Sequence, residues 1–333
     1  MKKSILIVYG ASTKLTFVDQ FVKDEFGRDI STDIIYFGHH KTWYSGSWYR
    51  YISNSVHMLK LILHILLLAP KSKIVIFSTN AARLLFPFLF WSNASVIFNE
   101  LPVLDPKYIL YRYDRLIFCK FHKVYLSSIA RVELVMKSYD LERSIGLVNN
   151  IPNLTGFINY KTEQARNGFI YSGLISPGRF SVSDKKLEEL AVASKMRIDF
   201  FGFKSFGYEL DQRFFDHRGN VPHAEMLKIL ERYKFGILQY AQSDYNNEYC
   251  APIKIYEYLS LGCIILSVNK NIGLKRLESE FPGIIYFLDD IDLSPDTMAL
   301  DQLTFNKHSA QRCLKEAYRT NTEFVLDVLR DMT

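Results

Sequence analysis

Short apolar segments alternate with helix-like segments along the chain, and this alternation limits the fold more than any other feature of the sequence. Ser4–Tyr9 and Lys73–Ser78 are examples of such apolar runs, and each is followed by residues typical of a turn or a helix start. Short, continuously apolar strands separated by helices are typical of a parallel sheet covered on both faces. The sequence therefore predicts an α/β fold.

The alternation runs twice, with a pause near the middle of the chain. The first series ends in a helix expected at Ser128–Tyr139, and the second begins with a strand at Gly168–Ser172. The residues between them include Val148–Asn153 and a polar stretch, Asn159–Gly168, which are typical of a connection.

The length of the chain also favours two domains. It has 333 residues, and single hydrophobic cores stop growing at about 250–300 residues. We expect two doubly wound, Rossmann-like domains, residues 1–153 and 154–306. A final helix in residues 307–333 is expected to pack back towards the first domain.

Charge and cysteine content exclude several classes of protein. The net charge of +6 is too small to indicate nucleic-acid binding by itself, and it suits anionic small molecules or an anionic membrane surface. No secretory signal and no apolar run of about 18 residues is apparent, so a membrane-spanning helix is not expected. The cysteines lack CxxC and Cys/His spacings, which argues against a disulfide framework or a structural zinc site and favours the cytoplasm: Cys119, Cys250, Cys263 and Cys313.

The segment Pro252–Ser267 carries the charges that most directly suggest a ligand. It reads as a helix that contains Lys254 and Glu257, is stopped by Gly262 and is followed at once by an apolar strand. The spacing of three residues places both charges on one helical face. Ligands of open α/β sheets bind at the carboxyl ends of the strands. A cation for a phosphate and a carboxylate for two hydroxyls at that place suit a nucleotide-sugar.

The pattern Pro-x-Lys-x-x-Glu-Tyr-Leu-x-x-Gly, from Pro252 to Gly262, resembles the signature of two-domain GT-B glycosyltransferases. The resemblance is to the GT4-like group, which includes bacterial polysaccharide and lipopolysaccharide enzymes. Further segments resemble elements of that family in the same order: Ile151–Asn153, Tyr171–Leu174, Phe200–Gly202 and Val221–Met226.

The resemblance implies a fold and a reaction. The fold is GT-B, in which two Rossmann-like domains with parallel sheets face a central cleft. The reaction moves a sugar, for which a hexose is expected, from a nucleoside-diphosphate sugar to a glycan or polyprenyl-linked acceptor. The products would be bacterial cell-surface polysaccharides such as O-antigen, lipopolysaccharide or capsule.

The resemblance also implies roles for four donor-side residues. Glu257 would accept hydrogen bonds from the ribose hydroxyls, and Lys254 would offer its charge to the diphosphate. Arg179, unless it is an ordinary loop arginine, would add a second phosphate contact, and the backbone at Gly173 would approach the phosphates closely. Fixed cations and helix N-terminal amides would stabilise the leaving diphosphate without a metal or other cofactor. A UDP-sugar is favoured as donor, with GDP- and dTDP-sugars as alternatives.

One departure from the family pattern affects the sugar side of the site. Many GT4 members have two glutamates separated by seven residues, but Tyr249 stands at that spacing before Glu257. The stereochemistry, retaining or inverting, therefore stays open. The candidates for contacts with the sugar hydroxyls are Asp244, Asn246, Asn247 and Glu248.

The acceptor side is expected at the carboxyl ends of the first domain's strands. Glu100 follows the strand expected at Ser95–Asn99, and it is the leading candidate for the general base of an inverting enzyme. A loop or helix-capping carboxylate is an equally consistent interpretation. His39, with His40, comes next, although a surface turn accommodates both. Gly10 lies in a strand-to-helix turn that could contact an acceptor phosphate.

An aromatic and basic stretch, residues 41–51, follows the second expected strand. Trp43 and Trp48 stand there among Tyr, Lys and Arg residues, a composition that suits a bilayer interface. We therefore expect peripheral attachment to the inner face of the cytoplasmic membrane. Within the helix expected at Ser53–Leu68, the stretch Leu59–Leu68 is apolar nearly all round, and we expect it to be buried against the sheet.

Two other functions remain open from the sequence. The first is a GT-B-like nucleotide-sugar 2-epimerase, which would need no acceptor. The second is a catalytically silent binding protein of the same fold. The membrane-like aromatic stretch argues mildly against the first, and the intact Lys254 and Glu257 argue against the second.

Overall fold

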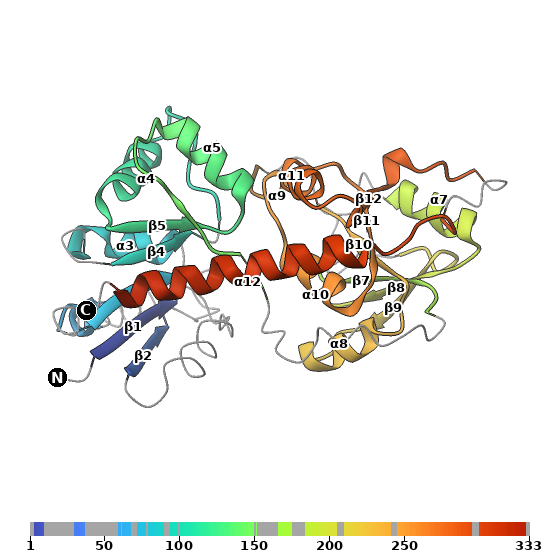
Figure 1. The fold of residues 1–333 in the computed structure, drawn as a ribbon, viewed down its shortest axis with the longest axis horizontal. Coiled ribbons are helices and arrows are strands. Elements are labelled where there is room, and N and C mark those ends of the chain that lie inside the picture. The colour runs from blue at the N-terminus through green and yellow to red at the C-terminus, as the bar shows by residue number, and fades with distance from the viewer. Residues whose placement is uncertain are drawn as a thin grey trace, which may run out of the picture. The chain divides into compact units, whose positions relative to one another are not determined.

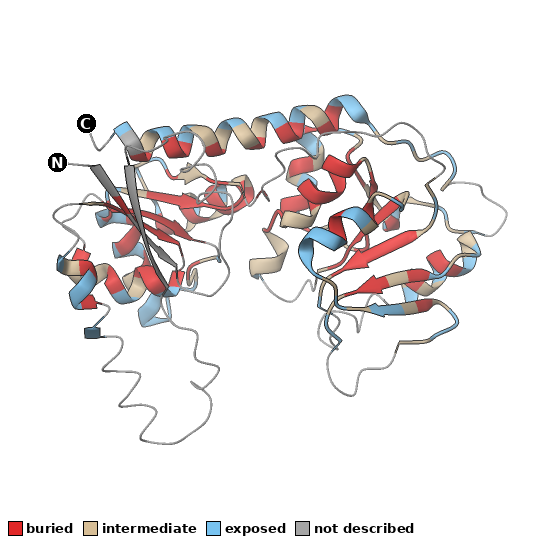
Figure 2. Ribbon diagram, turned by 90° about the horizontal axis from the view of Figure 1, so that it is seen from below, coloured by how far each residue is buried: buried red, intermediate tan, exposed pale blue. Residues whose placement is uncertain are grey.

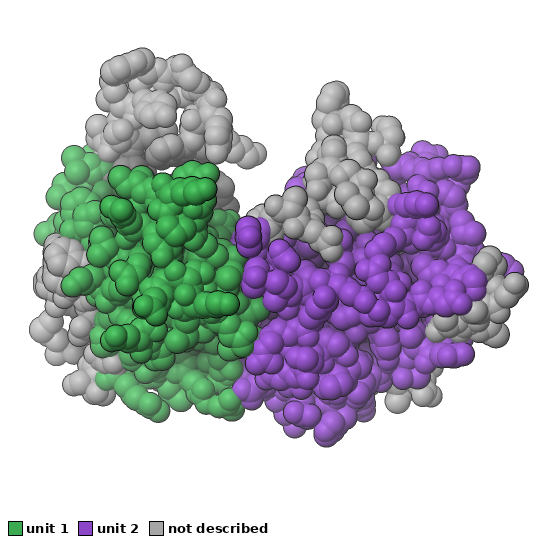
Figure 3. All heavy atoms as spheres, turned by 90° about the horizontal axis from the view of Figure 1, so that it is seen from above, with its two compact units in different colours: residues 1–149, 319–333 green, residues 150–318 purple. Residues whose placement is uncertain are grey.

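A computed structural model describes residues 3–9, 30–36, 59–60, 62–67, 72–77, 79–89, 94–98, 100–149, 151, 166–174, 184–204, 210–240, 245–294 and 300–330. The chain divides into two compact units, coloured separately in Figure 3. Unit 1 comprises Met1–Asn149 and Arg319–Thr333, and unit 2 comprises Asn150–Tyr318. The domain boundaries expected after residues 153 and 306 stay predictions.

Unit 1 contains a six-stranded parallel sheet in the order β2-β1-β3-β4-β5-β6. A right-handed crossover on either side of β1 produces such an order, and the order reverses between β1 and β3. The strands are β1 (Lys3–Tyr9), β2 (Ile30–Tyr36), β3 (Ser72–Phe77), β4 (Ser95–Phe98), β5 (Lys123–Leu126) and β6 (Gly146–Leu147).

The described helices that connect these strands share one hydrophobic core with the sheet (Figure 1). They are a helical segment at residues 59–60 and 62–67, α3 (Thr79–Leu89), α4 (Ile109–Lys120) and α5 (Ile129–Tyr139). Ser128 caps α5 by accepting a hydrogen bond from the amide of Arg131, and Asp140 ends it in a left-handed conformation.

The helical segment at residues 59–60 and 62–67 does not fit the expected complete burial. Ile62 and Ile65 are buried, but Leu59, Leu63 and Leu67 are 57%, 52% and 73% exposed. Residues four apart lie on one side of a helix. The prediction was therefore wrong for this side, because an apolar sequence alone does not show which face meets the sheet.

Unit 2 contains a second six-stranded parallel sheet, in the order β12-β11-β10-β7-β8-β9. Numbered from its own first strand, this is the Rossmann order 3-2-1-4-5-6, and the order reverses between β7 and β10. The strands are β7 (Phe169–Ser172), β8 (Ile198–Phe201), β9 (Phe215–Gly219), β10 (Phe235–Leu238), β11 (Ile264–Ser267) and β12 (Ile285–Phe287). The two parallel sheets confirm the predicted α/β class.

The helices of unit 2 pack on this sheet through two hydrophobic clusters. In Figure 2 the central strands are buried, while the helices carry both buried and exposed residues. The helices are α7 (Asp184–Ser194), α8 (His223–Leu230), α9 (Tyr245–Glu248), α10 (Ile253–Leu261), α11 (Ile272–Glu280) and the short 3-10 helix Leu288–Asp290.

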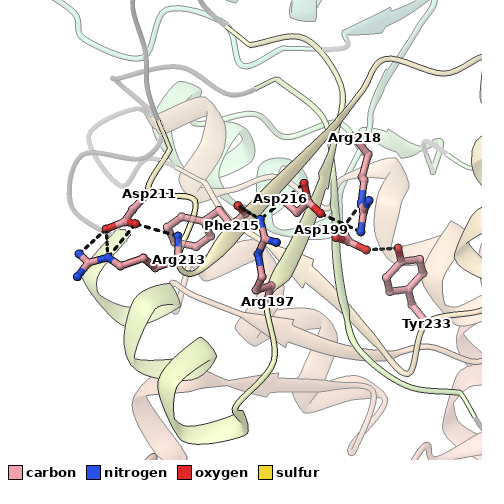
Figure 4. Close-up of polar contacts among 8 residues, drawn as sticks. All are labelled: Arg197, Asp199, Asp211, Arg213, Phe215, Asp216, Arg218 and Tyr233. Atoms are coloured by element: carbon pink, nitrogen blue, oxygen red, sulfur yellow. Dashed lines mark hydrogen bonds and ion pairs between the residues drawn. The ribbon is translucent and has the colours of Figure 1, made fainter.

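Strand β9 forms one edge of the second sheet and has a polar sequence. Arg218 on β9 donates to Asp199 on β8 at 3.1 Å and pairs with Asp216 at 2.9 Å. Figure 4 shows these residues and their contacts. The hydroxyl of Tyr233 also donates to Asp199; burial raises the pKa of Tyr233, and this hydrogen bond raises it further. Charged side chains on an edge strand discourage pairing with another chain.

Helix α12 (Lys307–Arg330) belongs to both units, since the division falls between Tyr318 and Arg319. In unit 2, Ala310, Cys313, Leu314 and Ala317 join the core. In unit 1, the buried Asn321 exchanges hydrogen bonds with the backbone of Asn149, at 2.7 and 2.9 Å.

No helix in the described part of the chain is both long and apolar enough to cross a membrane.

Candidate functional site

The reversal of strand order between β7 and β10 marks the place in unit 2 where a ligand is expected. Two glycines follow strands there. Gly173 comes after β7 with φ of 149°, and Gly202 comes after β8 with φ of 135°. The amide of Gly173 donates to the Phe201 carbonyl at 2.7 Å, and a Cβ on Gly202 would clash with the backbone of Gly173. Both turns therefore need glycine, and they leave backbone without side chains at the strand ends.

Helix α10 delivers the two predicted charged residues to this end of the sheet. Pro252, with an extended backbone, precedes its first turn, and Gly262 ends it in a left-handed conformation with φ of 74°. The amide of Cys263 donates back to the Tyr258 carbonyl at 2.9 Å, which satisfies one of the terminal acceptors. Residues 255–261 are all buried. Local capping and burial thus fix the direction in which the first turn points.

Lys254 lies in the first turn of α10 and reaches the end of β7. Its Nζ lies 4.2 Å from the centroid of the Tyr171 ring, a cation–π contact. A Cβ on Gly173 would clash with that Nζ, so the ammonium group stands directly beside the glycine turn. The side chain is half-buried. The arrangement holds a positive charge where an anionic group would meet bare backbone.

Glu257 lies one turn further along α10 and is buried, with 5% of the residue exposed. Its Oε1 is 2.7 Å from Nε2 of His223, the first residue of α8, and Nε2 donates because an ionised carboxylate only accepts. This hydrogen bond raises the pKa of His223, against the opposing effect of its partial burial. Among the described residues, His223 is the partner of this carboxylate, so acceptor positions on Glu257 remain for a ligand's hydroxyls.

Three of the residues expected near the sugar lie in the short helix α9: Asn246, Asn247 and Glu248. All three are partly exposed, and the backbone carbonyl of Asn247 accepts a hydrogen bond from Asn271 at 3.0 Å. Burial raises the pKa of the neighbouring Tyr249, with a smaller contribution from Glu248. Asp244 lies outside the described residues, as does Arg179.

In unit 1, Glu100 follows β4 and is exposed. Its backbone carbonyl accepts a hydrogen bond from Thr79, the first residue of α3, at 3.4 Å. A carboxylate thus stands at the carboxyl end of the sheet. The other candidates of this unit, Gly10, His39, His40, Trp43 and Trp48, lie outside the described residues.

Two residues of the site were not assigned a role from the sequence. Tyr171 lies below the ammonium group of Lys254, and His223 holds the carboxylate of Glu257. His223 is 34 residues from Glu257, so no local spacing connects the pair. The one signal for His223 in the sequence is its place in Val221–Met226, the segment that resembles a GT-B element and starts a helix.

No family model matches the sequence, and no curated protein matches it either. Solved structures do match over almost the full length. HepE (Alr3699) from Anabaena, in complex with UDP and glucose, has a TM-score of 0.64 and 11% identity, with 98% of this chain and 100% of that chain covered. The E. coli structure described as trehalose-6-phosphate bound with UDP-2-fluoro glucose has a TM-score of 0.63 and 9% identity, with 98% and 99% covered.

A plant structure also matches. Arabidopsis thaliana UGT89C1, complexed with quercetin, has a TM-score of 0.51 and 11% identity, with 98% of this chain and 100% of that chain covered. At such low identity, the likeness concerns the fold. Two parallel α/β sheets in one chain, matched from end to end, establish that this chain has the GT-B fold.

Proposed function

We propose that the chain is a glycosyltransferase that moves a sugar from a nucleoside-diphosphate sugar to a glycan or lipid-linked acceptor. One observation carries this proposal: α10 places Lys254 beside the Gly173 turn and the buried Glu257 beside His223, at the point where the strand order of unit 2 reverses. A charge for the diphosphate and a carboxylate for the ribose are what a nucleotide-sugar requires there.

The donor would bind with its phosphates at Gly173 and Lys254. Glu257 has room to accept hydrogen bonds from two ribose hydroxyls, since His223 uses one of its oxygens. Lys254, Arg179 and the first amides of α10 would stabilise the charge that develops on the leaving diphosphate, so we propose a reaction that needs no metal. A UDP-sugar is the proposed donor, supported by the UDP compounds bound to HepE and to the E. coli structure.

On the acceptor side, Glu100 would orient the acceptor hydroxyl or, in an inverting reaction, remove its proton. Its exposure at the carboxyl end of β4 supports this role. Asn247, Glu248 and Asp244 are the proposed contacts of the transferred sugar. The proposed products are bacterial cell-surface polysaccharides, and the support for them is the resemblance of the segment Pro252–Gly262.

The donor site is tested by thermal shift with UDP, GDP, dTDP and CMP compounds. We expect a nucleoside diphosphate to raise the melting temperature, with UDP giving the largest shift. Because hydrogen bonds to a charged group are worth about 1.5–3 kcal/mol each, Glu257→Gln should weaken nucleotide binding at least about tenfold. Glu189→Ala, which removes an exposed carboxylate of α7, is the matched control and should leave the affinity unchanged.

A failure of all the nucleotides to stabilise the folded protein would show that the proposed donor site is wrong. If a nucleotide binds, Glu100→Gln separates the two substrates: it should preserve the nucleotide shift and lower the rate of sugar transfer. Transfer at the wild-type rate by that variant would remove Glu100 from the acceptor site.

A further inference from the structure

Three successive helical segments of unit 1 form one layer on its sheet. They are the segment at residues 59–60 and 62–67, α3 and α4, and they precede β3, β4 and β5. Strands β3, β4 and β5 are neighbours in the sheet, so the connections that lead to them all step across the sheet towards β6. Right-handed connections that step in the same direction place their helices on the same face of the sheet. The three segments therefore lie next to each other on that face. Their buried residues belong to a single core, and Phe86 of α3 lies against Tyr113 of α4, with 5.5 Å between ring centroids.

The outer side of this layer exposes large apolar residues. Leu59, Leu63 and Leu67 form a stripe on the first segment, Leu84 is exposed on α3, and Ile109 on α4 is 84% exposed. Leu116 lies two turns beyond Ile109 on the same side of α4, opposite the buried Phe118. Grouped exposed apolar residues mark an interaction surface, whereas single ones do not.

The charges on this outer side have one sign. Among the described residues of the three segments, the acidic residue is Asp114, which is buried and bound by Arg83 at 2.6 and 2.7 Å. The exposed charged residues are basic: Lys60, Arg112, Arg115 and Lys120. Arg112 and Lys120 lie on the same side of α4 as Ile109 and Leu116.

A helix of unit 2 provides the contrast. Helix α7 also exposes a large apolar residue, Val192, at 54%. Its charges are mixed, however, and Lys185 pairs with Glu189 one turn away at 3.9 Å. Such a surface is typical of a helix that faces water.

We propose that the outer side of residues 59–67, α3 and α4, here named the docking face, binds an anionic lipid bilayer. Apolar side chains can enter the interfacial region while flanking Lys and Arg residues meet acidic headgroups. A second copy of the chain is disfavoured as the occupant, because a symmetric contact would bring like charges together. The inference does not depend on the donor site in unit 2.

Vesicle co-sedimentation of the full chain tests this proposal. We expect binding to vesicles that contain phosphatidylglycerol, weaker binding to vesicles of phosphatidylcholine alone, and release of part of the bound protein by high salt. Each basic residue near an anionic surface contributes about 1 kcal/mol, so Arg112→Glu with Lys120→Glu should weaken binding at least about tenfold. Ile109→Asp should have a comparable effect, because it places a charge on the most exposed apolar position.

Matched controls lie on α7. Val192→Asp and Lys185→Glu make the same changes at exposed positions of unit 2 and should leave vesicle binding unchanged. Three results would overturn the proposal: no binding of the wild type to anionic vesicles, equal loss in the α7 controls, or wild-type binding by the docking-face variants. A dimer in analytical ultracentrifugation that Ile109→Asp dissociates, without any vesicle binding, would assign the face to self-association instead.

Discussion

Units 1 and 2 share a parallel-sheet plan but use buried carboxylates in opposite ways. Asp114 in unit 1 accepts three hydrogen bonds, two from Arg83 and one from the Val103 amide at 2.8 Å. Among the described residues, Glu257 in unit 2 has one side-chain partner, His223, at the end of the sheet where open α/β sheets in general bind their ligands. A carboxylate whose acceptor positions are occupied is part of the architecture. A carboxylate that keeps unused acceptor positions beside a reversal of strand order can accept hydrogen bonds from a ligand.

The contacts of Arg83 in unit 1 support a structural role for Asp114. Asp114 raises the pKa of Arg83 through their direct hydrogen bonds, and the Tyr113 hydroxyl donates to the Arg83 carbonyl at 2.7 Å. The Tyr139 hydroxyl donates to the carbonyl of Val103, also at 2.7 Å. These bonds hold the segment that follows Glu100, the carboxylate proposed above for the acceptor.

The largest effect is expected in unit 2. Gly202→Ala should destabilise the protein by at least about 3 kcal/mol, because strain at a positive φ is joined by a clash with the backbone of Gly173. Gly219→Ala is the control, with a φ of 81° but no atom within 4 Å of the new Cβ. It should cost about 1–2 kcal/mol. Urea unfolding measures both, and equal costs would show that the two strand ends are not packed as described.

A smaller effect is expected for the buried pair of unit 1. Asp114→Ala should cost about 3 kcal/mol or somewhat less, since Arg83 is partly exposed and can regain water. Hydrogen exchange should show faster opening of residues 101–105, while nucleotide binding by unit 2 stays intact. The control Asp211→Ala removes a surface partner of Arg213 and should change neither the stability nor the hydrogen exchange of residues 101–105. Loss of nucleotide binding in Asp114→Ala would contradict the separation of roles between the units.

The smallest effect concerns pH. Because Glu257 raises the folded-state pKa of His223 above its usual value of about 6.5, the pair's contribution is complete below about pH 6.5 and is lost as the pH rises through the raised pKa. The imidazole is largely exposed, so the expected contribution is only about 0.5 kcal/mol. A double-mutant cycle of His223→Gln and Glu257→Gln measures the coupling. Coupling that grows with rising pH would contradict the ion-pair assignment.

Local signals in the sequence determined much of the fold. Pro252 and Gly262 bound α10 at the expected residues because capping depends on neighbouring residues. The long helix α12 was also expected, and it begins at the expected residue, Lys307. Strands β6 and β9 were missed, since one has two residues and the other, Phe215–Gly219, is largely polar. Pairing with a neighbouring strand creates such elements, and a single strand's sequence does not contain that information.

The candidate site could also be predicted only where the signal lies in neighbouring residues of the sequence. The helix that carries Lys254 and Glu257 was identified, but the partners of these residues come from β7 and α8. The exposed side of residues 59–67 was missed for a related reason. Their near-uniform apolar character gives no period from which to choose a buried face.

The shared helix α12 has a consequence for biosynthesis. Unit 1 is discontinuous: Asn149 and Tyr125 find partners in Asn321 and Asp327, with Tyr125 donating to Asp327 at 2.7 Å. A ribosome delivers the first 149 residues long before these partners emerge. Domains made of one continuous stretch can fold as they leave the ribosome, but the first unit of this protein is complete only when residues 319–330 of α12 have been translated. The second unit, made in between, is the first that can close completely.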